Sequence, residues 1–350
     1  MSIAIFKSKL IRINTSYSFK KGRWLMLHFI FYQFVGITSL ILYIVNTLFF
    51  ATLFIPFALL KLLLPFQIVK NGCNKALDSL SSCWISVNTL NLLMTRRVHV
   101  DVSGLDHLKE KEWYLVVSNH QTWTDILILQ KIFNHKIPFL KFFLKKELIW
   151  MPILGLCWWA LDYPFMKRYS KSFIKKYPHL EGKDIEITKK ACEKYKNMPV
   201  SVMNFMEGTR FTTEKHEKQQ SPYNYLLRPK AGGIAFVLAS MGDHLNSILD
   251  VTIVYPQGKK SFWAFMCGKV NDVIVRVDSL DITEDMKGDY FHDPVFRSRF
   301  QDWVNTLWSR KDVKIGYLME YARTGKLKEA YYENLVPHFP TMISSSEMPA

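Results

Sequence analysis

Two residues five positions apart, His120 and Asp125, are of types that suit acid–base chemistry; they stand in the stretch SNHQTWTD, residues 118–125. On one continuous helix they would lie about 140° apart, so they meet only if His120 lies on a loop and Asp125 in the first turn of the next helix. Thr122 and Asp125 have the spacing of a capping pair, which agrees with a helix that begins there. A histidine held by a carboxylate in this way is suited to act as a general base.

The simplest proton for such a base to remove is that of a substrate hydroxyl. The sequence has no Gly-x-Ser-x-Gly motif, and no cysteine adjoins the pair, so a nucleophile from the protein itself is not indicated. Taken alone, however, the His-x-x-x-x-Asp spacing also fits a helix cap beside an incidental histidine.

A second polar group follows the apolar run VMNFM, residues 202–206, and reads Glu207-Gly208-Thr209-Arg210. An arginine next to a glycine at the exit of a strand suits a phosphate, because it combines a fixed fork of donors with an approachable backbone. Glu207 could orient Arg210 or hold a substrate hydroxyl. By itself the group also fits an ordinary turn with a surface ion pair.

Both groups stand where strands are expected to end. Short strand-like runs alternate with helix-like runs from residue 98 onward: strands near 98–102, 113–118, 200–205 and 251–255, with helices near 126–132 and 233–240. This pattern predicts an α/β fold with a mostly parallel sheet flanked by helices. Open sheets of this kind bind ligands at the carboxyl ends of their strands, which is where His120 would lie.

An N-terminal membrane anchor is predicted by the distribution of charge. Residues 1–23 hold six basic side chains and no acidic one, and residues 24–60 hold no Asp, Glu, Lys or Arg. Thirty-seven helical residues would extend about 55 Å, beyond a hydrocarbon core of roughly 30 Å. The run is too long for a signal peptide. It forms either one long span or a helical hairpin, and basic residues on both sides favour a hairpin with both ends and the following domain in the cytoplasm, at the inner membrane if bacterial.

The composition agrees with a membrane-bound protein. The 350 residues include 46 Lys and Arg against 30 Asp and Glu, a formal charge of +16, and 49% hydrophobic residues, which excludes a disordered or collagen-like chain. Five widely spaced cysteines without a Cys-x-x-Cys pair indicate neither a disulfide framework nor a structural zinc site. The basic excess is therefore expected to meet an anionic membrane surface and phosphate groups, and no nucleic acid is expected.

Five segments are expected along the chain: a basic N-terminal segment (1–23), the membrane anchor (24–60), a helical linker (61–90), the α/β domain (91–325) and a C-terminal tail (326–350). The nearly uncharged stretch 148–161, which holds Trp150, Trp158 and Trp159, is too short to span a bilayer. It is expected either in the core or at an interfacial surface or acyl-chain tunnel.

Four blocks together resemble the glycerolipid acyltransferase family, whose members include the 1-acylglycerol-3-phosphate acyltransferases. The Asn-His-x-x-x-x-Asp block appears as Asn119–Asp125, and the Glu-Gly-Thr-Arg block as Glu207–Arg210. A Phe-x-x-Arg block between them appears as Phe165–Arg168, and an apolar strand ending in proline as Val251–Pro256. Residues 145–168, and Met206 where the simpler bacterial enzymes usually carry proline, resemble the branch with YihG-type and lysocardiolipin acyltransferases.

The resemblance implies a role for each matched residue. His120 would remove the proton from a glycerol hydroxyl that attacks an acyl thioester, Asp125 would orient His120, and Asn119 would flank the pair. The phosphate of the acceptor would be bound by a pocket of five residues: Arg168, Glu207, Gly208, Thr209 and Arg210. The implied partners are acyl-CoA or an acyl-carrier protein as donor and a lysophospholipid as acceptor, with no cofactor and no metal.

The implied product is phosphatidate, formed from 1-acylglycerol-3-phosphate. A lysocardiolipin-type remodelling acyltransferase is the alternative within the family. A basic membrane-tethered binding protein without catalysis is the alternative outside it, and it leaves His120, Asp125 and residues 207–210 without a role.

Overall fold

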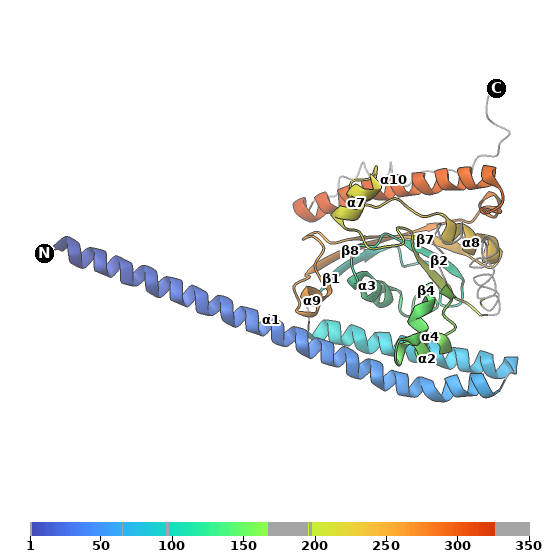
Figure 1. The fold of residues 1–350 in the computed structure, drawn as a ribbon, viewed down its shortest axis with the longest axis horizontal. Helices are drawn as coiled ribbons and strands as arrows, with labels where there is room; N and C mark the ends of the chain where they lie inside the picture. Colours follow the sequence, from blue (N-terminus) through green and yellow to red (C-terminus); the bar gives the residue numbers. More distant parts are fainter. Residues whose placement is uncertain (1, 65, 96–97, 167–194, 196–197, 326–350) are drawn as a thin grey trace, which may run out of the picture.

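The computed structural model describes residues 2–64, 66–95, 98–166, 195 and 198–325. Figure 1 shows a mixed α/β body with two long helices, α1 (Ser2–Leu63) and α2 (Gln67–Thr95), along one side. Arg168 and the expected tail at 326–350 lie outside the described residues.

The centre of the body is a six-stranded sheet in the order β1-β8-β7-β2-β6-β3. The strands are β1 (His99–Ser103), β2 (Tyr114–Ser118), β3 (Leu140–Phe142), β6 (Ser201–Phe205), β7 (Ser247–Val254) and β8 (Asp272–Leu280). All neighbouring pairs are parallel except β7 and β8, which are antiparallel. The mostly parallel sheet predicted from the sequence is thus confirmed.

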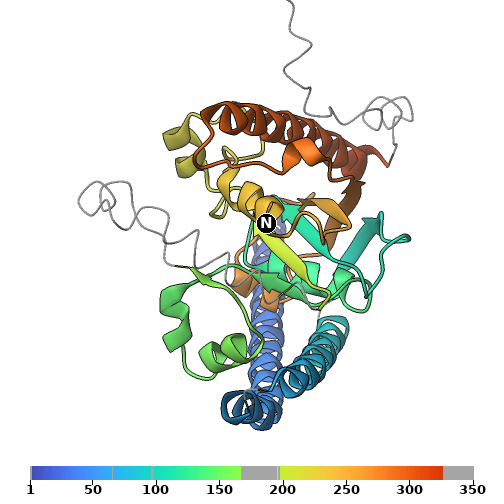
Figure 2. The ribbon, with the colours of Figure 1, turned by 90° about the vertical axis from the view of Figure 1, so that its right-hand side faces the viewer.

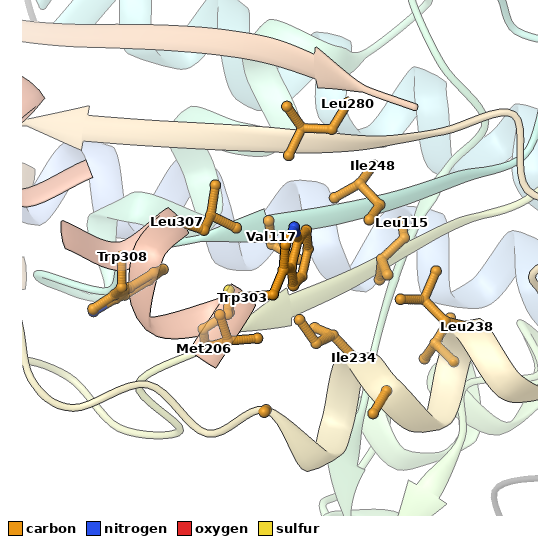
Figure 3. Close-up of a cluster of buried hydrophobic side chains, with 14 of the residues drawn as sticks. Leu115, Val117, Met206, Ile234, Leu238, Ile248, Leu280, Trp303, Leu307 and Trp308 are labelled. Atoms are coloured by element: carbon orange, nitrogen blue, oxygen red, sulfur yellow. The ribbon is translucent and has the colours of Figure 1, made fainter. Parts of the chain in front are cut away.

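Two layers of helices cover the sheet. The shorter helices are α3 (Thr124–Phe133), α7 (Thr213–Gln219), α8 (Gly232–Met241) and α9 (Phe262–Met266), with the 3₁₀ turn η3 (Glu284–Met286). One face packs against α8 and the long helix α10 (Pro294–Thr324), and Figure 3 shows this core, where Trp303 and Leu307 of α10 approach Val117 of β2. The other face packs against α3 and α9, with α1 and α2 beyond them (Figure 1).

The central strands are apolar because both of their faces are covered. All five residues of β2 and all eight of β7 are buried, as expected for strands between two layers of helices. The charged residue of β7 is Asp250, which pairs with the buried Lys311 of α10 at 2.6 Å. This pair fixes α10 across the sheet.

The N-terminal apolar run is one continuous helix. Helix α1 passes through residues 24–60 without a break, so the hairpin expected within this run is wrong and the single-helix alternative is what the structure has. The chain reverses after Leu64 and α2 returns along α1, so the segment expected as a linker packs on α1. Polar residues inside the apolar run make these contacts: Asn46 donates to Asn88 Oδ1 at 2.8 Å, and Asn91 donates to the carbonyl of Ser39 at 3.2 Å.

Helix α1 touches the α/β body at two places. Near its middle, Gln33 accepts a hydrogen bond from Trp263 of α9 at 2.9 Å, and a Cβ on Gly36 would lie only 2.6 Å from Cys267 Sγ. Near its end, Lys61 pairs with Asp162 at 2.7 Å. Among the described residues, Met26–Leu63 is the one helix long and apolar enough to cross a membrane, and it runs beside the body over most of that length.

A small excursion of the chain, residues 144–166, leaves the sheet after β3. It consists of β4 (Leu144–Lys145), the 3₁₀ helix η1 (Lys146–Trp150), α4 (Leu154–Ala160) and β5 (Phe165–Met166). Strands β4 and β5 pair in parallel and close it at its base. We call residues 144–166 the aromatic lobe; Figure 2 shows it in green as a separate projection beside α1 and α2.

Candidate active site

His120 and Asp125 meet at the carboxyl end of β2. His120 lies on the loop that leaves the strand, and Asp125 lies in the first turn of α3. The distance from His120 Nδ1 to Asp125 Oδ2 is 2.8 Å, and the aspartate side chain is fully buried. The carboxylate accepts a proton held on Nδ1, so the neutral imidazole has its lone pair on Nε2.

Asp125 is held by three further hydrogen bonds. Its Oδ2 accepts the backbone N–H groups of Gln121 at 2.6 Å and Thr122 at 2.9 Å, and its Oδ1 accepts the Tyr255 hydroxyl at 2.7 Å. The expected cap from Thr122 is not formed, because the Thr122 hydroxyl donates instead to the carbonyl of Lys260 at 3.3 Å. The loop is therefore closed by the aspartate and not by the threonine.

Tyr255 is a member of the site that was not selected from the sequence. It follows β7, which neighbours β2, so its hydroxyl reaches Asp125 across 130 positions of sequence. Burial, followed by the charge of Asp125 and their hydrogen bond, raises the pKa of Tyr255 well above its ordinary value. The phenol therefore stays protonated and remains a donor at any working pH. The sequence signal that could have pointed to Tyr255 is its position directly before Pro256, in the block Val251–Pro256.

The imidazole of His120 stacks on the ring of Phe205, the last residue of β6, with centroids 3.9 Å apart and planes inclined by 12°. His120 is 9% exposed, so only an edge of the ring reaches solvent. Among the residues that the structure describes, no hydrogen bond joins a protein group to Nε2. The ring is fixed by Asp125 and Phe205, while Nε2 remains available to a substrate.

Glu207 positions the loop of His120 from the neighbouring strand. Its Oε1 accepts the backbone N–H of His120 at 2.6 Å, and its Oε2 accepts that of Leu227 at 3.0 Å. The side chain is completely buried, and burial raises the pKa of Glu207 to about 7, against the effect of the two N–H groups. Both oxygens of Glu207 accept backbone N–H groups, so the described structure gives this residue no bond to Arg210; orienting Arg210 was one of the two roles considered from the sequence.

The turn that contains Leu227 is itself held by hydrogen bonds with α10. Trp308 Nε1 donates to the carbonyl of Leu227 at 2.9 Å. Asp312 accepts the backbone N–H groups of Asn224 at 2.8 Å and Tyr225 at 2.7 Å. A chain of hydrogen bonds thus runs from α10 through the turn and Glu207 to the backbone of His120.

Arg210 lies beside the histidine loop with an exposed side chain. Its guanidinium carbon stands 4.5 Å from the ring centroid of Trp123, which is three residues after His120. The next residue, Phe211, donates its N–H to the carbonyl of His120 at 2.8 Å. The stacked guanidinium is oriented by the indole and retains donors for an anion.

Gly208 and Thr209 bring two lysines close to this arginine. Gly208 has φ +66°, and a Cβ there would stand 3.0 Å from Nζ of Lys230, so glycine serves both the backbone conformation and the close approach. Thr209 Oγ1 accepts a hydrogen bond from Lys215 at 2.7 Å. The segment therefore gathers several cations near the exposed edge of the site.

Asn119 fixes the end of β2 to β7. Its side-chain amide donates to the carbonyl of Ile253 and accepts the N–H of the same residue, both at 2.9 Å. Arg168, the remaining site residue expected from the sequence, lies outside the described residues. Within the described ranges, no group of three His, Cys, Asp or Glu side chains is arranged to hold a metal ion.

Residues 99–256 match the family model described as Acyltransferase. Less than half of the chain is therefore similar to the acyltransferase family. The match includes His120, Asp125, residues 207–210 and Tyr255, and it ends before α10.

Several curated acyltransferases are similar to this chain. A 1-acyl-sn-glycerol-3-phosphate acyltransferase 3 of Arabidopsis thaliana is 30% identical over 45% of this chain and 42% of its own length. A 2-acyl-1-lysophosphatidylinositol acyltransferase of Saccharomyces cerevisiae is 24% identical over 63% and 64%, and a lysocardiolipin acyltransferase 1 of Gallus gallus is 24% identical over 62% and 58%. The matched part spans between 42% and 64% of these relatives.

Among solved structures, the 1-acyl-sn-glycerophosphate acyltransferase PlsC of Thermotoga maritima is similar at 19% identity and a TM-score of 0.44. The comparison covers 81% of this chain and 98% of that chain.

Proposed function

We propose that this protein is a membrane-bound O-acyltransferase that moves an acyl chain from a thioester, either acyl-CoA or acyl-carrier protein, to the free hydroxyl of 1-acylglycerol-3-phosphate. The product is phosphatidate. The observation that carries the proposal is the buried His120–Asp125 pair, with Nε2 of the histidine available beside the exposed Arg210.

The reaction follows from the tautomer that Asp125 imposes. Nε2 of His120 removes the proton of the acceptor hydroxyl while the oxygen attacks the thioester carbonyl carbon. Asp125 stabilises the imidazolium that forms. The tetrahedral intermediate then expels the thiolate, which takes the proton from Nε2, so that ester and thiol leave and the histidine is again neutral.

Arg210 is proposed to bind the phosphate of the acceptor. Its guanidinium offers a planar fork of donors, which suits a phosphate, and stacking on Trp123 holds that fork in place. Gly208 and Thr209 shape the backbone beside it, and Glu207 contributes by fixing His120. Arg168 is proposed as a further phosphate ligand on the resemblance of its motif alone.

Helix α1 is proposed as the membrane anchor, with the catalytic domain on the cytoplasmic side. Because α1 touches the body near both Gln33 and Lys61, its apolar length runs beside the domain and does not stand away from it. This arrangement favours a helix embedded along the membrane surface, with its exposed apolar side in the lipid, over one that crosses the bilayer.

A second candidate substrate class is a larger lysophospholipid, such as lysocardiolipin. The similar chains named for lysocardiolipin and lysophosphatidylinositol cover more of this chain than the Arabidopsis relative does. The same His120 chemistry serves either acceptor, so a panel of lysophospholipids against acyl-CoA and acyl-carrier-protein donors decides between them.

The test of the catalytic role is His120→Ala, with His99→Ala as the matched control, since His99 is an exposed histidine on β1. Loss of a general base lowers the rate by about 10²–10⁴-fold. Thiol release from acyl-CoA with lysophosphatidate as acceptor should therefore nearly vanish in His120→Ala and persist in the control. Both variants should still sediment with vesicles. An unchanged rate in His120→Ala would refute the mechanism.

A further inference from the structure

The aromatic lobe carries large apolar side chains that face solvent. These are Trp150 (84% exposed), Ile153 (47%), Leu156 (45%), Met151 (42%) and Trp159 (37%). They follow one another along η1 and α4, and Leu156 and Trp159 lie on one face of the helix at a spacing of three. Single exposed apolar residues are ordinary, whereas a continuous patch marks an interaction surface.

The inner side of the lobe is fixed to the end of α1. Lys61 donates to the carbonyl of Ala160 at 2.6 Å and pairs with Asp162 at 2.7 Å. Ala160 and Leu161 are buried against Phe54 and Ala58 of α1. The lobe is thus held on α1, with Trp158 packed against this core while Trp150 and Trp159 are exposed.

Further exposed apolar residues stand at the end of the helix pair that Lys61 joins to the lobe. The apolar residues there that face solvent are Leu59, Leu60, Leu62, Leu63, Phe66 and Ile68. Figure 2 shows the lobe and the two helices on the same side of the molecule, with α10 on the opposite side of the sheet. The lobe therefore extends the apolar surface of the proposed anchor sideways.

Charge and residue type at the lobe suit a phospholipid surface. Lys145 and Lys146 are exposed at the start of the patch, next to the exposed Glu147, while the other acidic residue of the lobe, Asp162, is paired with Lys61. Basic residues at this position attract anionic headgroups. Tryptophan is favoured at the boundary between headgroups and acyl chains, because its indole has an apolar body and a polar N–H.

We propose that the aromatic lobe is a second membrane contact, in which Trp150 and Trp159 insert into the headgroup–acyl boundary while Lys145 and Lys146 face lipid headgroups. The inference rests on the proposed membrane association of α1 and adds a contact made by the catalytic domain itself. The lobe is close to the proposed active site. The ring centroid of Phe142, just before the lobe, lies 6.1 Å from that of Phe205, the ring on which His120 stacks. This contact sets the height of the active site above the lipid.

The test places an environment-sensitive fluorophore on a single cysteine at position 150. Trp150→Cys is made in full-length protein whose five native cysteines are replaced and which retains acyl transfer, and the protein is reconstituted in vesicles of phosphatidylcholine and phosphatidylglycerol. Phe34→Cys on α1 (66% exposed) reports on the anchor, and Val295→Cys on α10 (71% exposed) is the matched control away from the membrane. Quenching is measured with brominated lipids and with aqueous iodide.

The proposal predicts that lipid bromines quench the probes at positions 150 and 34 and that iodide quenches the probe at position 295. Lipid quenching at 34 but iodide quenching at 150 would overturn the second contact and leave the anchor intact. Iodide quenching at both 34 and 150 would overturn the anchor and the second contact together. A probe at 150 shielded from both quenchers would mean that another protein or a second copy of this chain covers the patch, which also overturns the proposal.

Discussion

Replacing Tyr255 by phenylalanine removes one hydrogen bond from Asp125, the aspartate proposed to act with His120. The hydroxyl donates to Asp125 Oδ1 at 2.7 Å, whereas the three other donors, including the His120 ring, all meet Oδ2. Without the phenol, Oδ1 becomes a buried acceptor with no partner, because the Asp125 side chain is fully buried. The carboxylate is then held through Oδ2 alone, and its alignment with the imidazole loosens.

The size of the effect follows from the kind of bond. A hydrogen bond to a charged group contributes about 1.5–3 kcal/mol. If all of it acted on the transition state, the rate would fall roughly 10- to 150-fold, since about 1.4 kcal/mol is tenfold. The bond also exists before substrate binds, so part of the loss appears as reduced folding stability. We expect kcat to fall about 10- to 30-fold.

The assay is steady-state thiol release in detergent micelles, with kcat and KM measured for each substrate in Tyr255→Phe and in a control. Tyr163→Phe is the matched control, because the buried Tyr163 hydroxyl donates to a neutral carbonyl, that of Leu140, at 2.9 Å. Tyr163→Phe should lower the melting temperature and leave kcat within about twofold, since it loses a neutral bond worth about 1 kcal/mol.

Two results would refute the reasoning about Tyr255. An unchanged kcat with a lower melting temperature would make the residue purely structural. A raised KM with an unchanged kcat would mean that its hydroxyl touches substrate and does not act through Asp125.

Three further perturbations test the supports of the site. Glu207→Gln leaves one of two backbone N–H groups without an acceptor, which costs about 1–3 kcal/mol and should lower kcat; a wild-type rate would contradict its positioning role. In the folded protein the pKa of Glu207 is raised to about 7. The protonated carboxyl therefore contributes stability below about pH 4.5, and this contribution is lost as the pH rises to about 7. Glutamine does not titrate, so the melting temperature of Glu207→Gln should vary less with pH over that range than that of the wild type. Lys311→Met leaves the buried Asp250 unpaired and should lower the free energy of unfolding in urea by about 3–5 kcal/mol. Adding Asp250→Asn to this variant should restore part of the loss. Equal stabilities of Lys311→Met and the wild type would show that the pair is not needed. Arg210→Ala should raise KM for the lysophospholipid about tenfold or more and leave KM for acyl-CoA unchanged, and a change confined to the donor would refute phosphate binding.

The parts of the site that the sequence predicts well are local. His120 and Asp125 are five residues apart, and a strand followed by a helix leaves few geometries in which they meet. The strands around them are continuous apolar runs, which periodicity detects. The distant supports, Glu207 at 87 positions from His120 and Tyr255 at 130 from Asp125, depend on the strand order β7-β2-β6, and a single sequence does not specify that order.

The error over the N-terminal run has a similar origin. Basic residues on both sides of residues 24–60 suggested a reversal inside it, but only isolated Gly36 and Pro56 interrupt the run, and neither breaks α1. The reversal comes after Leu64, and the returning helix is polar enough that hydropathy does not mark it as a partner. Charge flanking thus placed the reversal inside a run that the structure shows as an unbroken helix.

The hydrogen bonds from α10 have a practical meaning for dissecting the protein. The family match ends at residue 256, yet Trp308 and Asp312 hold the turn that supports Glu207, and Lys311 neutralises Asp250 in the strand beside β2. A fragment trimmed to the matched residues would retain every residue assigned to catalysis and lose what keeps the histidine loop in place. The smallest piece of this chain expected to remain catalytically competent therefore extends through Thr324, where α10 ends.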